Sequence, residues 1–201
     1  MNKIICIGRQ YGSGGREIGY TLAKELGISF YDKEIMQEIL NTSDLPRKLL
    51  EKADEHSPHS LLHTVLYQGA EKAYYGMESN AILFEMQKKF ILKKAQQENC
   101  IIVGRCAGSI LENQSGCCAL SIFVAAQMDD RIQRIMERKK IDSHDASALI
   151  RKTDKQREKY YNFYTNKDWG KPSDYDITLN SSKWGSERSI ALLLDLYTRL
   201  L

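Results

Sequence analysis

Short apolar runs alternate along the chain with longer stretches in which apolar residues recur every three or four positions. The runs at 3–7, 100–103 and 119–125 are rich in β-branched residues and predict buried strands. Shorter runs at 28–31 and 176–179 predict two further strands. Because short buried strands that alternate with helices are typical of a parallel sheet covered on both faces, the pattern predicts an α/β fold.

Between these runs, apolar residues recur at helical spacing. Ile18, Leu22 and Leu26 share one helical face, and Gly27 is placed to end that helix. Asp32 is placed to cap a helix over 33–40. Further helices are predicted at 78–99, 129–140 and 142–163, with a last helix from Ser186, and a helical insertion is expected at 41–76.

The composition fits a single domain over residues 1–201. Hydrophobic residues make up 42% of the chain and there are three prolines, so a full core can form. No apolar run approaches the roughly 20 residues of a membrane span, and the chain opens directly on a strand, so neither membrane insertion nor export is expected. The five cysteines form no CxxC pair, which favours reduced thiols in a cytoplasmic protein and gives no support for a metal site.

Basic residues are concentrated in one late segment. Residues 131–159 hold ten Lys or Arg against five Asp or Glu, although the net charge of the whole chain is only +3. Because acids are interleaved there and no nucleic-acid module is evident, we favour small anionic ligands over nucleic acid. Arg131, Arg134 and Arg138 share one helical face, for which a solvated, ion-paired face is the common explanation and a functional role the alternative.

A glycine-rich stretch follows the first strand, and the helical pattern begins directly after it. Glycines let successive backbone N–H groups turn inward, and such groups at a helix N-terminus form a cradle for phosphate. We interpret the stretch as a phosphate-binding loop, the alternative being a turn that only connects strand to helix. The expected nucleotide-binding residues here are Arg9, Gly12, Ser13, Gly14, Gly15, Arg16 and Glu17.

The loop departs from the regular Walker A pattern, GxxxxGK[ST]. When its inner glycines are aligned with that pattern, Gly15 stands at the lysine position and Arg16 at the position of the hydroxyl residue. The first glycine of the pattern is replaced by Arg9. Arg16, with Arg9 as the second candidate, is therefore expected to supply the missing positive charge.

The order of motifs along the chain resembles that of the nucleoside monophosphate kinases, most closely the cytidylate kinases and their cytidylate-kinase-like relatives. The resemblance covers nearly the whole chain. After the glycine loop it rests on Phe30-Tyr31-Asp32, Ile101-Ile102-Val103-Gly104-Arg105, Phe123-Val124-Ala125-Ala126 with Arg131 and Arg134, Arg151-Lys152-Thr153-Asp154-Lys155-Gln156-Arg157, and Asp176-Ile177-Thr178-Leu179-Asn180.

This resemblance implies a three-layer P-loop fold with an acceptor-binding insertion at about 41–76 and a lid at about 139–170. It implies transfer of the γ-phosphoryl group of ATP, with Mg²⁺ possible, to a nucleoside monophosphate such as CMP or dCMP. Tyr31, Asp32 and Arg105 are then expected to bind the acceptor. Arginine matches phosphate in a bidentate way and stays charged, which suits phosphoryl transfer. The expected catalytic residues are Arg16, Arg105, Arg151 and Arg157.

Two departures from the family pattern bear on turnover. The loop lacks its lysine and hydroxyl residue, and Val103 and Cys106 stand where the family has acidic residues on either side of Gly-Arg. These losses leave a second interpretation open, in which the protein binds ATP as a catalytically weak or inactive regulatory module. A nucleic-acid-binding protein that uses the basic segment is the third and least favoured interpretation.

Overall fold

The computed structural model describes residues 1–32, 35 and 79–200, so the predicted insertion at 41–76 and nearly all of the predicted helix at 33–40 lie outside the described residues. The described chain contains one five-stranded sheet with all strands parallel, in the order β2-β3-β1-β4-β5. The predicted α/β fold is therefore confirmed. The strands are β1 (Asn2–Arg9), β2 (Ser29–Tyr31), β3 (Cys100–Val103), β4 (Cys117–Ala125) and β5 (Ile177–Asn180).

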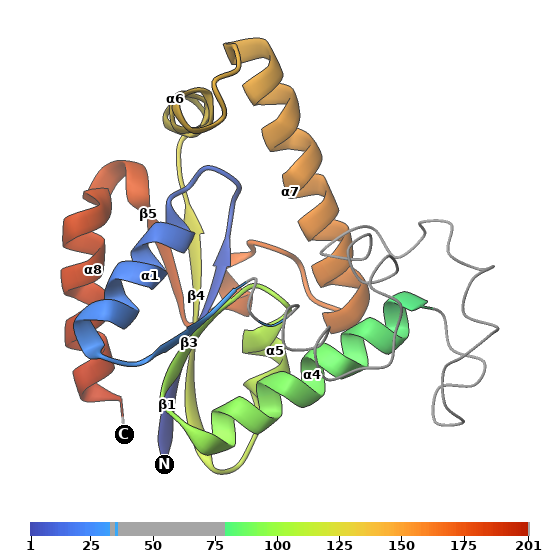
Figure 1. The fold of residues 1–201 in the computed structure, drawn as a ribbon, viewed down its shortest axis with the longest axis vertical. Helices are drawn as coiled ribbons and strands as arrows, with labels where there is room; N and C mark the ends of the chain where they lie inside the picture. Colours follow the sequence, from blue (N-terminus) through green and yellow to red (C-terminus); the bar gives the residue numbers. More distant parts are fainter. Residues whose placement is uncertain (33–34, 36–78, 201) are drawn as a thin grey trace.

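Helices cover both faces of the sheet and make a three-layer arrangement (Figure 1). One face carries α1 (Gly15–Leu26) and α8 (Ser181–Arg199), and the other carries α4 (Ser79–Gln97) and α5 (Ala107–Leu111). A hairpin of α6 (Met128–Lys139) and α7 (Ser143–Thr165) extends beyond the sheet, and a short 3₁₀ turn, η3 (Pro172–Asp174), precedes β5. None of the described helices combines the length and apolarity needed to cross a membrane.

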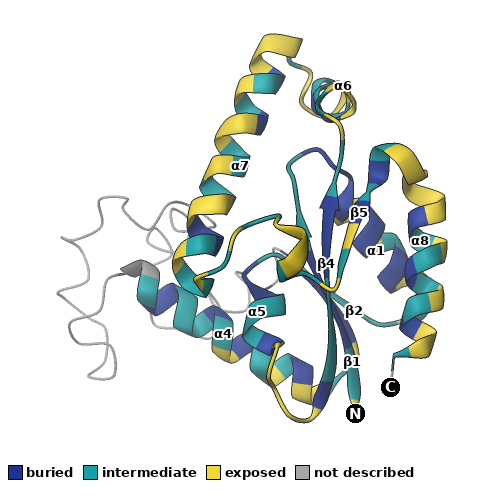
Figure 2. Cartoon of the chain, turned by 180° about the vertical axis from the view of Figure 1, so that it is seen from behind, coloured by how far each residue is buried: buried dark blue, intermediate teal, exposed yellow. Residues whose placement is uncertain are grey.

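The core lies on both faces of the sheet because successive side chains of a strand point to opposite faces. Ile5 and Ile7 of β1 pack with α1 and α8, whereas Ile4 and Cys6 pack with α4 and α5. Figure 2 shows buried residues gathered in the strands and on the inner sides of the helices. The part of α7 beyond the sheet is mostly half-buried or exposed, which leaves it attached to the core through few elements.

The structure differs from the sequence pattern at a few boundaries. Strand β4 begins at Cys117, two residues before the predicted start. Helix α5 was not predicted, because five residues are too few to display a helical period. Helix α8 begins at Ser181, but Gly185 has a φ of 70° and interrupts it, so the regular helix starts near the predicted residue, Ser186.

Candidate functional site

The glycine loop joins the carboxyl end of β1 to α1. Gly12 and Gly14 have φ values of 82° and 80°, a left-handed conformation that favours glycine, and Gly14 is the N-cap residue of α1. Ser13 is fully buried, and its carbonyl oxygen accepts a 2.6 Å hydrogen bond from the hydroxyl of Ser181 at the start of α8. The loop is thus fixed at the positive end of the α1 dipole, where an anion is favoured.

Gly15, at the position of the Walker A lysine, lies too close to its neighbours to carry a side chain. A Cβ atom there would lie 2.9 Å from Cβ of Arg9 and 3.0 Å from Cβ of Val124. Neither of these atoms is the far end of a flexible side chain, so neither can move aside cheaply. The close packing of this loop on β1 and β4 therefore excludes a lysine at this position.

Arg16 and Arg9 both reach the carboxylate that follows β2. Nε of Arg16 donates a 2.6 Å hydrogen bond to Oδ2 of Asp32, and Nη2 of Arg9 lies 3.7 Å from Oδ1 of the same residue. Asp32 is only 5% exposed, and the Arg16 guanidinium also lies 5.8 Å from the ring centre of Phe30. The structure therefore brings Arg9, Arg16 and Asp32 together and holds the Arg16 charge against a carboxylate.

The α6–α7 hairpin is attached to the glycine loop through Tyr11. The backbone N–H of Tyr11 donates a 2.7 Å hydrogen bond to Oδ1 of Asp154 on α7, and its carbonyl oxygen accepts a 2.8 Å hydrogen bond from Nε of Arg131 on α6. Arg131 is 4% exposed and forms an ion pair with Asp154. One buried ion pair thus links both helices of the hairpin to the backbone of the loop.

The other two arginines of the α6 face also contact the loop region. Arg134 donates a hydrogen bond to the carbonyl oxygen of Gly12, and Arg138 lies 3.2 Å from a carboxylate oxygen of Glu17. The Arg138 guanidinium also stacks over the Tyr11 ring at 5.2 Å. The expected ion pairs are present for Arg131 and Arg138, and Arg138 is exposed as expected. The expectation of a solvated face is wrong for the buried Arg131, and the groups that these arginines contact come from the loop, α1 and α7.

Arg105 enters the site from an unusual turn after β3. Gly104, Arg105 and Cys106 have φ values of 82°, 57° and 57°, so three successive residues are left-handed and two of them are not glycine. Such a conformation costs on the order of 1 kcal/mol or more per non-glycine residue and persists where the surrounding packing imposes it. The turn leaves Arg105 only 3% exposed and on the wall of a cavity.

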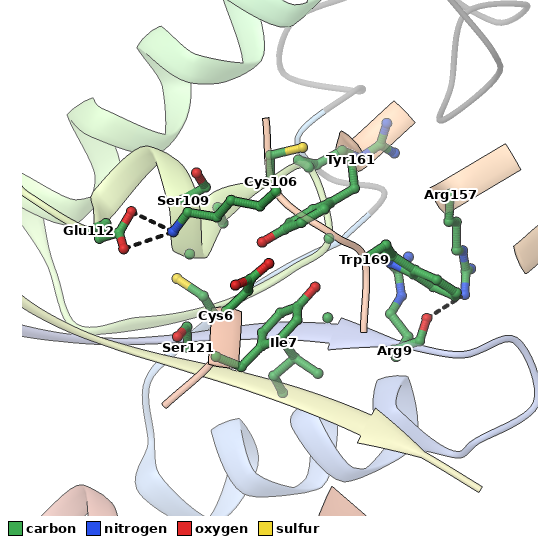
Figure 3. A pocket seen from close by; sticks show the side chains of 18 of the residues that line it. Cys6, Ile7, Arg9, Cys106, Ser109, Glu112, Ser121, Arg157, Tyr161 and Trp169 are labelled. Carbon is green, nitrogen blue, oxygen red and sulfur yellow. Dashed lines mark hydrogen bonds and ion pairs between the residues drawn. The ribbon is translucent and has the colours of Figure 1, made fainter. Parts of the chain in front are cut away.

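This cavity has a volume of about 200 Å³ and lies between the sheet, α5, the end of α7 and the segment at 167–176 (Figure 3). At one end Nη1 of Arg157 donates a 3.2 Å hydrogen bond to the carbonyl oxygen of Arg9. At the other end the Lys167 ammonium forms an ion pair of 2.7 Å with Glu112. The cavity is therefore lined by three arginines, while its lysine is already neutralised.

Aromatic side chains form part of the cavity wall, beside the carboxylates of Asp174 and Asp176. Tyr161 stacks on Tyr175 with ring centres 5.9 Å apart, and Trp169 packs edge-on against Phe123 at 5.2 Å. Burial raises the pKa of Tyr175 well above its usual value, so this phenol stays protonated. The sequence pattern did not single out Trp169 or Tyr175, which only the tertiary fold brings to the cavity.

Of the predicted site residues, Arg9, Arg105 and Arg157 line this cavity, whereas the loop residues at 12–17, Tyr31, Asp32 and Arg151 do not. Arg151 is exposed on α7. Tyr31 packs against Phe90 of α4, and its hydroxyl donates a 2.6 Å hydrogen bond to Glu98. Hydrogen bonds from Ser29 and Tyr31 lower the pKa of Glu98 below its ordinary value of 4.5.

The buried thiols of Cys6 and Cys100 offer no reactive group to the site. No disulfide joins the five cysteines, all of which lie in the described part of the chain. Burial raises the pKa of Cys100 to about 12 and that of Cys6 well above its usual value. Since the thiolate is the nucleophile and the metal ligand, these buried thiols are structural.

The described residues do not fit a magnesium ion held by the protein at the loop. Glu17, Asp32 and Asp154, the carboxylates that contact loop or α1 residues in the described ranges, are each paired with arginine. Arg16 occupies the position at which a Walker A loop places the hydroxyl ligand. Among the described residues, one group has metal-ligand spacing, namely Asp142, His144 and Asp145, and it lies exposed at the start of α7.

Sequence comparison finds cytidylate kinases among the relatives. The cytidylate kinase of Thermococcus kodakarensis is 30% identical over 103 residues, which are 51% of this chain and 51% of that protein. That of Pyrococcus horikoshii is 31% identical over 103 residues, with the same coverage of 51% on both sides. The chain thus spans about half the length of the curated relatives it matches.

The matches to solved structures extend over nearly the whole chain. A crystal structure of an uncharacterized protein from Eubacterium ventriosum matches with a TM-score of 0.73 and 28% identity, covering 98% of this chain and 99% of that one. Shikimate kinase from Bacteroides thetaiotaomicron matches with a TM-score of 0.55 and 15% identity over 98% of both chains, which shows a shared fold. The predicted three-layer α/β fold is therefore confirmed.

A family model extends the match well beyond the half covered by the curated relatives. The model described as the cytidylate kinase-like family matches residues 4–183, from β1 through to the first turn of α8. This range includes the glycine loop, the Gly104-Arg105 turn and the α6–α7 hairpin. The chain therefore belongs to the cytidylate kinase-like family.

Proposed function

We propose that this protein transfers the γ-phosphoryl group of ATP to the phosphate of a nucleoside monophosphate. The observation that carries the proposal is the convergence of Arg9, Arg105 and Arg157 on one cavity next to the glycine loop. Arg9 is the last residue of β1, so it lines the cavity and also leads directly into the loop. A donor phosphate site and an acceptor phosphate site are then neighbours at the carboxyl edge of the sheet, where such folds bind ligands.

In this proposal the donor phosphates bind at the N-terminus of α1. The first N–H groups of a helix have no partner within the helix, and the left-handed glycines allow close approach of a phosphate. The backbone from Gly12 to Glu17 then surrounds the β- and γ-phosphates. Because the carboxylates near the loop are already paired with arginines, backbone N–H groups and arginines make the donor contacts in this proposal.

The acceptor phosphate would bind to Arg105 and Arg157 in the cavity. One oxygen of that phosphate attacks the γ-phosphorus in line, a new P–O bond forms, and the bond from the γ-phosphorus to the bridging oxygen of ADP breaks. Negative charge spreads over the three equatorial oxygens, and arginines can stabilise it by on the order of a thousandfold or more in rate. The buried position of Arg105 also excludes water, which would otherwise accept the phosphoryl group.

The proposed class of acceptor is inferred from the side chains of the cavity wall and from the curated relatives. Tyr161, Trp169 and Tyr175 give the cavity an aromatic side on which a planar base can stack. The curated relatives are cytidylate kinases, so CMP and dCMP are the first acceptors to test. The predicted acceptor-binding insertion at 41–76 and the predicted acceptor roles of Tyr31 and Asp32 remain part of this proposal.

A second candidate function is a nucleotide-binding module with little or no turnover. The observation that favours it is the packing around Gly15, which leaves no space for the lysine that contacts the β- and γ-phosphates in a Walker A loop. Such a module binds ATP without forming a phosphorylated product. Detection of product therefore separates the two candidates directly.

The test compares Arg105→Gln and Arg157→Gln with the parent chain in an ADP-release assay with ATP, Mg²⁺ and a panel of nucleoside monophosphates. We expect at least one acceptor to stimulate ADP release, and each substitution to lower kcat by about a hundredfold or more while the melting temperature stays close to that of the parent. Arg188→Gln, at an exposed position on α8, is the matched control. Unchanged turnover in both cavity variants would refute the assigned roles.

A further inference from the structure

The positive charge that a Walker A lysine brings to the donor phosphates has no source within this loop. Gly15 stands at the lysine position, and the Arg16 guanidinium is bound to Asp32 beside β2. We propose that Arg134, delivered by α6, takes the place of the missing lysine and binds the terminal phosphates of the donor. This inference rests on the proposed donor site and adds a residue from a different element to it.

Arg134 lies directly over the mouth of the loop. It donates a hydrogen bond to the carbonyl oxygen of Gly12, and its guanidinium covers the N-cap residue of α1. A Cβ atom built on Gly14 would lie 3.5 Å from Cζ and 3.5 Å from Nη1 of Arg134. The guanidinium is therefore within reach of any phosphate that the first N–H groups of α1 hold.

Arg134 differs from Arg16, Arg131 and Arg138 in its ion pairing. Arg131 is paired with Asp154, Arg138 with Glu17, and Arg16 with Asp32. Within the part of the chain that the structure describes, Arg134 has no carboxylate partner, and its one hydrogen bond goes to a neutral carbonyl. Its charge is thus the one on the α6 face that no described acid compensates.

The surroundings of Arg134 favour an anion. A cation at the N-terminus of a helix meets the positive end of the dipole, which is unfavourable. The Arg134 guanidinium stands over the N-cap residue of α1, so two positive features face each other across the loop. A di- or triphosphate bound between them would interact favourably with both, because each donates N–H groups toward the same space.

The test measures binding of ATP and of inorganic tripolyphosphate by titration calorimetry to the parent chain, Arg134→Gln and Arg134→Lys. Glutamine can still donate a hydrogen bond to Gly12 but carries no charge, whereas lysine keeps both. We expect Arg134→Gln to bind both ligands about tenfold more weakly or worse, because a charge-assisted contact is lost. Arg134→Lys should stay closer to the parent, and Arg188→Gln should equal it.

Each outcome bears on the inference. Arg134→Gln that binds tripolyphosphate as tightly as the parent would overturn it while leaving the proposed kinase function in place. Equal losses in the glutamine and lysine variants would also overturn it, because they would indicate a role of shape and not of charge. A parent chain that binds neither ATP nor tripolyphosphate would contradict the proposed function and this inference together. Should Arg134→Gln fail to fold, Arg134→Met, which keeps the aliphatic length without the charge, replaces it in the same comparison.

Discussion

Gly15 and Arg134 together determine how positive charge reaches the proposed donor phosphates at the glycine loop. The space that a lysine side chain would need is filled by Arg9 and Val124, which pack the start of α1 against β1 and β4. The charge is then brought by residues that are distant in sequence. A local motif search finds the loss at Gly15, but it cannot find a compensation that comes from α6.

Gly15→Ala should destabilise the protein, although alanine is the better helix former by about 1 kcal/mol. A Cβ atom at 2.9–3.0 Å from two other Cβ atoms forces a backbone shift, which costs about 1–3 kcal/mol. Urea unfolding of the variant and the parent measures the difference in the free energy of unfolding. An alanine variant as stable as the parent, or more stable, would show that the loop has more room than the structure gives it.

Glu98 makes a contribution to stability that depends on pH. Hydrogen bonds from Ser29 and Tyr31, with Lys94 at 3.4 Å, hold the pKa of its carboxyl below the ordinary value of 4.5. A carboxyl with a lowered folded-state pKa stabilises the fold above its unfolded-state pKa, and this contribution is lost as the pH falls through the folded-state pKa.

Glu98→Gln should therefore be less stable than the parent at pH 7, and the difference should narrow as the pH falls below about 4.5. Thermal melting of both proteins between pH 7 and pH 3 measures this change. Glu187→Gln, at an exposed position on α8, serves as the control. A stability difference that is constant over this range, or that widens at low pH, would contradict the assignment.

At the scale of elements, a buried ion pair holds the α6–α7 hairpin against the glycine loop together with the hydrogen bonds of Arg134 and Arg157. Arg131 and Asp154 join the two helices to the backbone of Tyr11, and Arg157 stacks over the ring of the same tyrosine at 5.5 Å. This arrangement sets the distance of Arg134 and Arg157 from the loop. The hairpin covers most of the predicted lid at about 139–170, whose opening and closing remain a prediction.

Asp154→Asn should loosen the hairpin from the loop. The change leaves the buried Arg131 charge without its partner, which costs about 3 kcal/mol of stability. If Arg134 binds the donor, affinity for tripolyphosphate should fall as well, because Asp154 positions α6 without touching the ligand. Glu158→Gln, at an exposed position on the same helix, is the control. Full stability and full affinity in Asp154→Asn would show that the ion pair does not hold the hairpin in place.

The sequence predicted the central elements better than their contacts. Strands β1, β3 and β4 were found because their apolar, β-branched runs are buried on both faces. The role of Asp32 as an ion-pair partner was not found, because a residue after a short strand looks the same whether it caps a helix or binds arginine. The contact between Arg134 and Gly12 joins residues 122 positions apart, and no local pattern encodes it.

At the scale of the whole molecule, the parallel order β2-β3-β1-β4-β5 brings distant segments to one edge of the sheet. The glycine loop after β1 and the Gly104-Arg105 turn after β3 are neighbours because β1 and β3 pair directly. The α6–α7 hairpin, which follows β4, lies over the same edge (Figure 1). The proposed donor and acceptor sites are therefore adjacent although their residues are spread over most of the chain.

The proposed function requires that a phosphoryl group passes between these two sites. The most direct measurement incubates the protein with ATP that is labelled with ¹⁸O on the γ-phosphoryl group, together with Mg²⁺ and one nucleoside monophosphate at a time, and analyses the products by mass spectrometry. We expect a labelled nucleoside diphosphate with at least one acceptor, and its loss in Arg105→Gln. Label found only in inorganic phosphate, or retained in ATP with every acceptor of the panel, would contradict it.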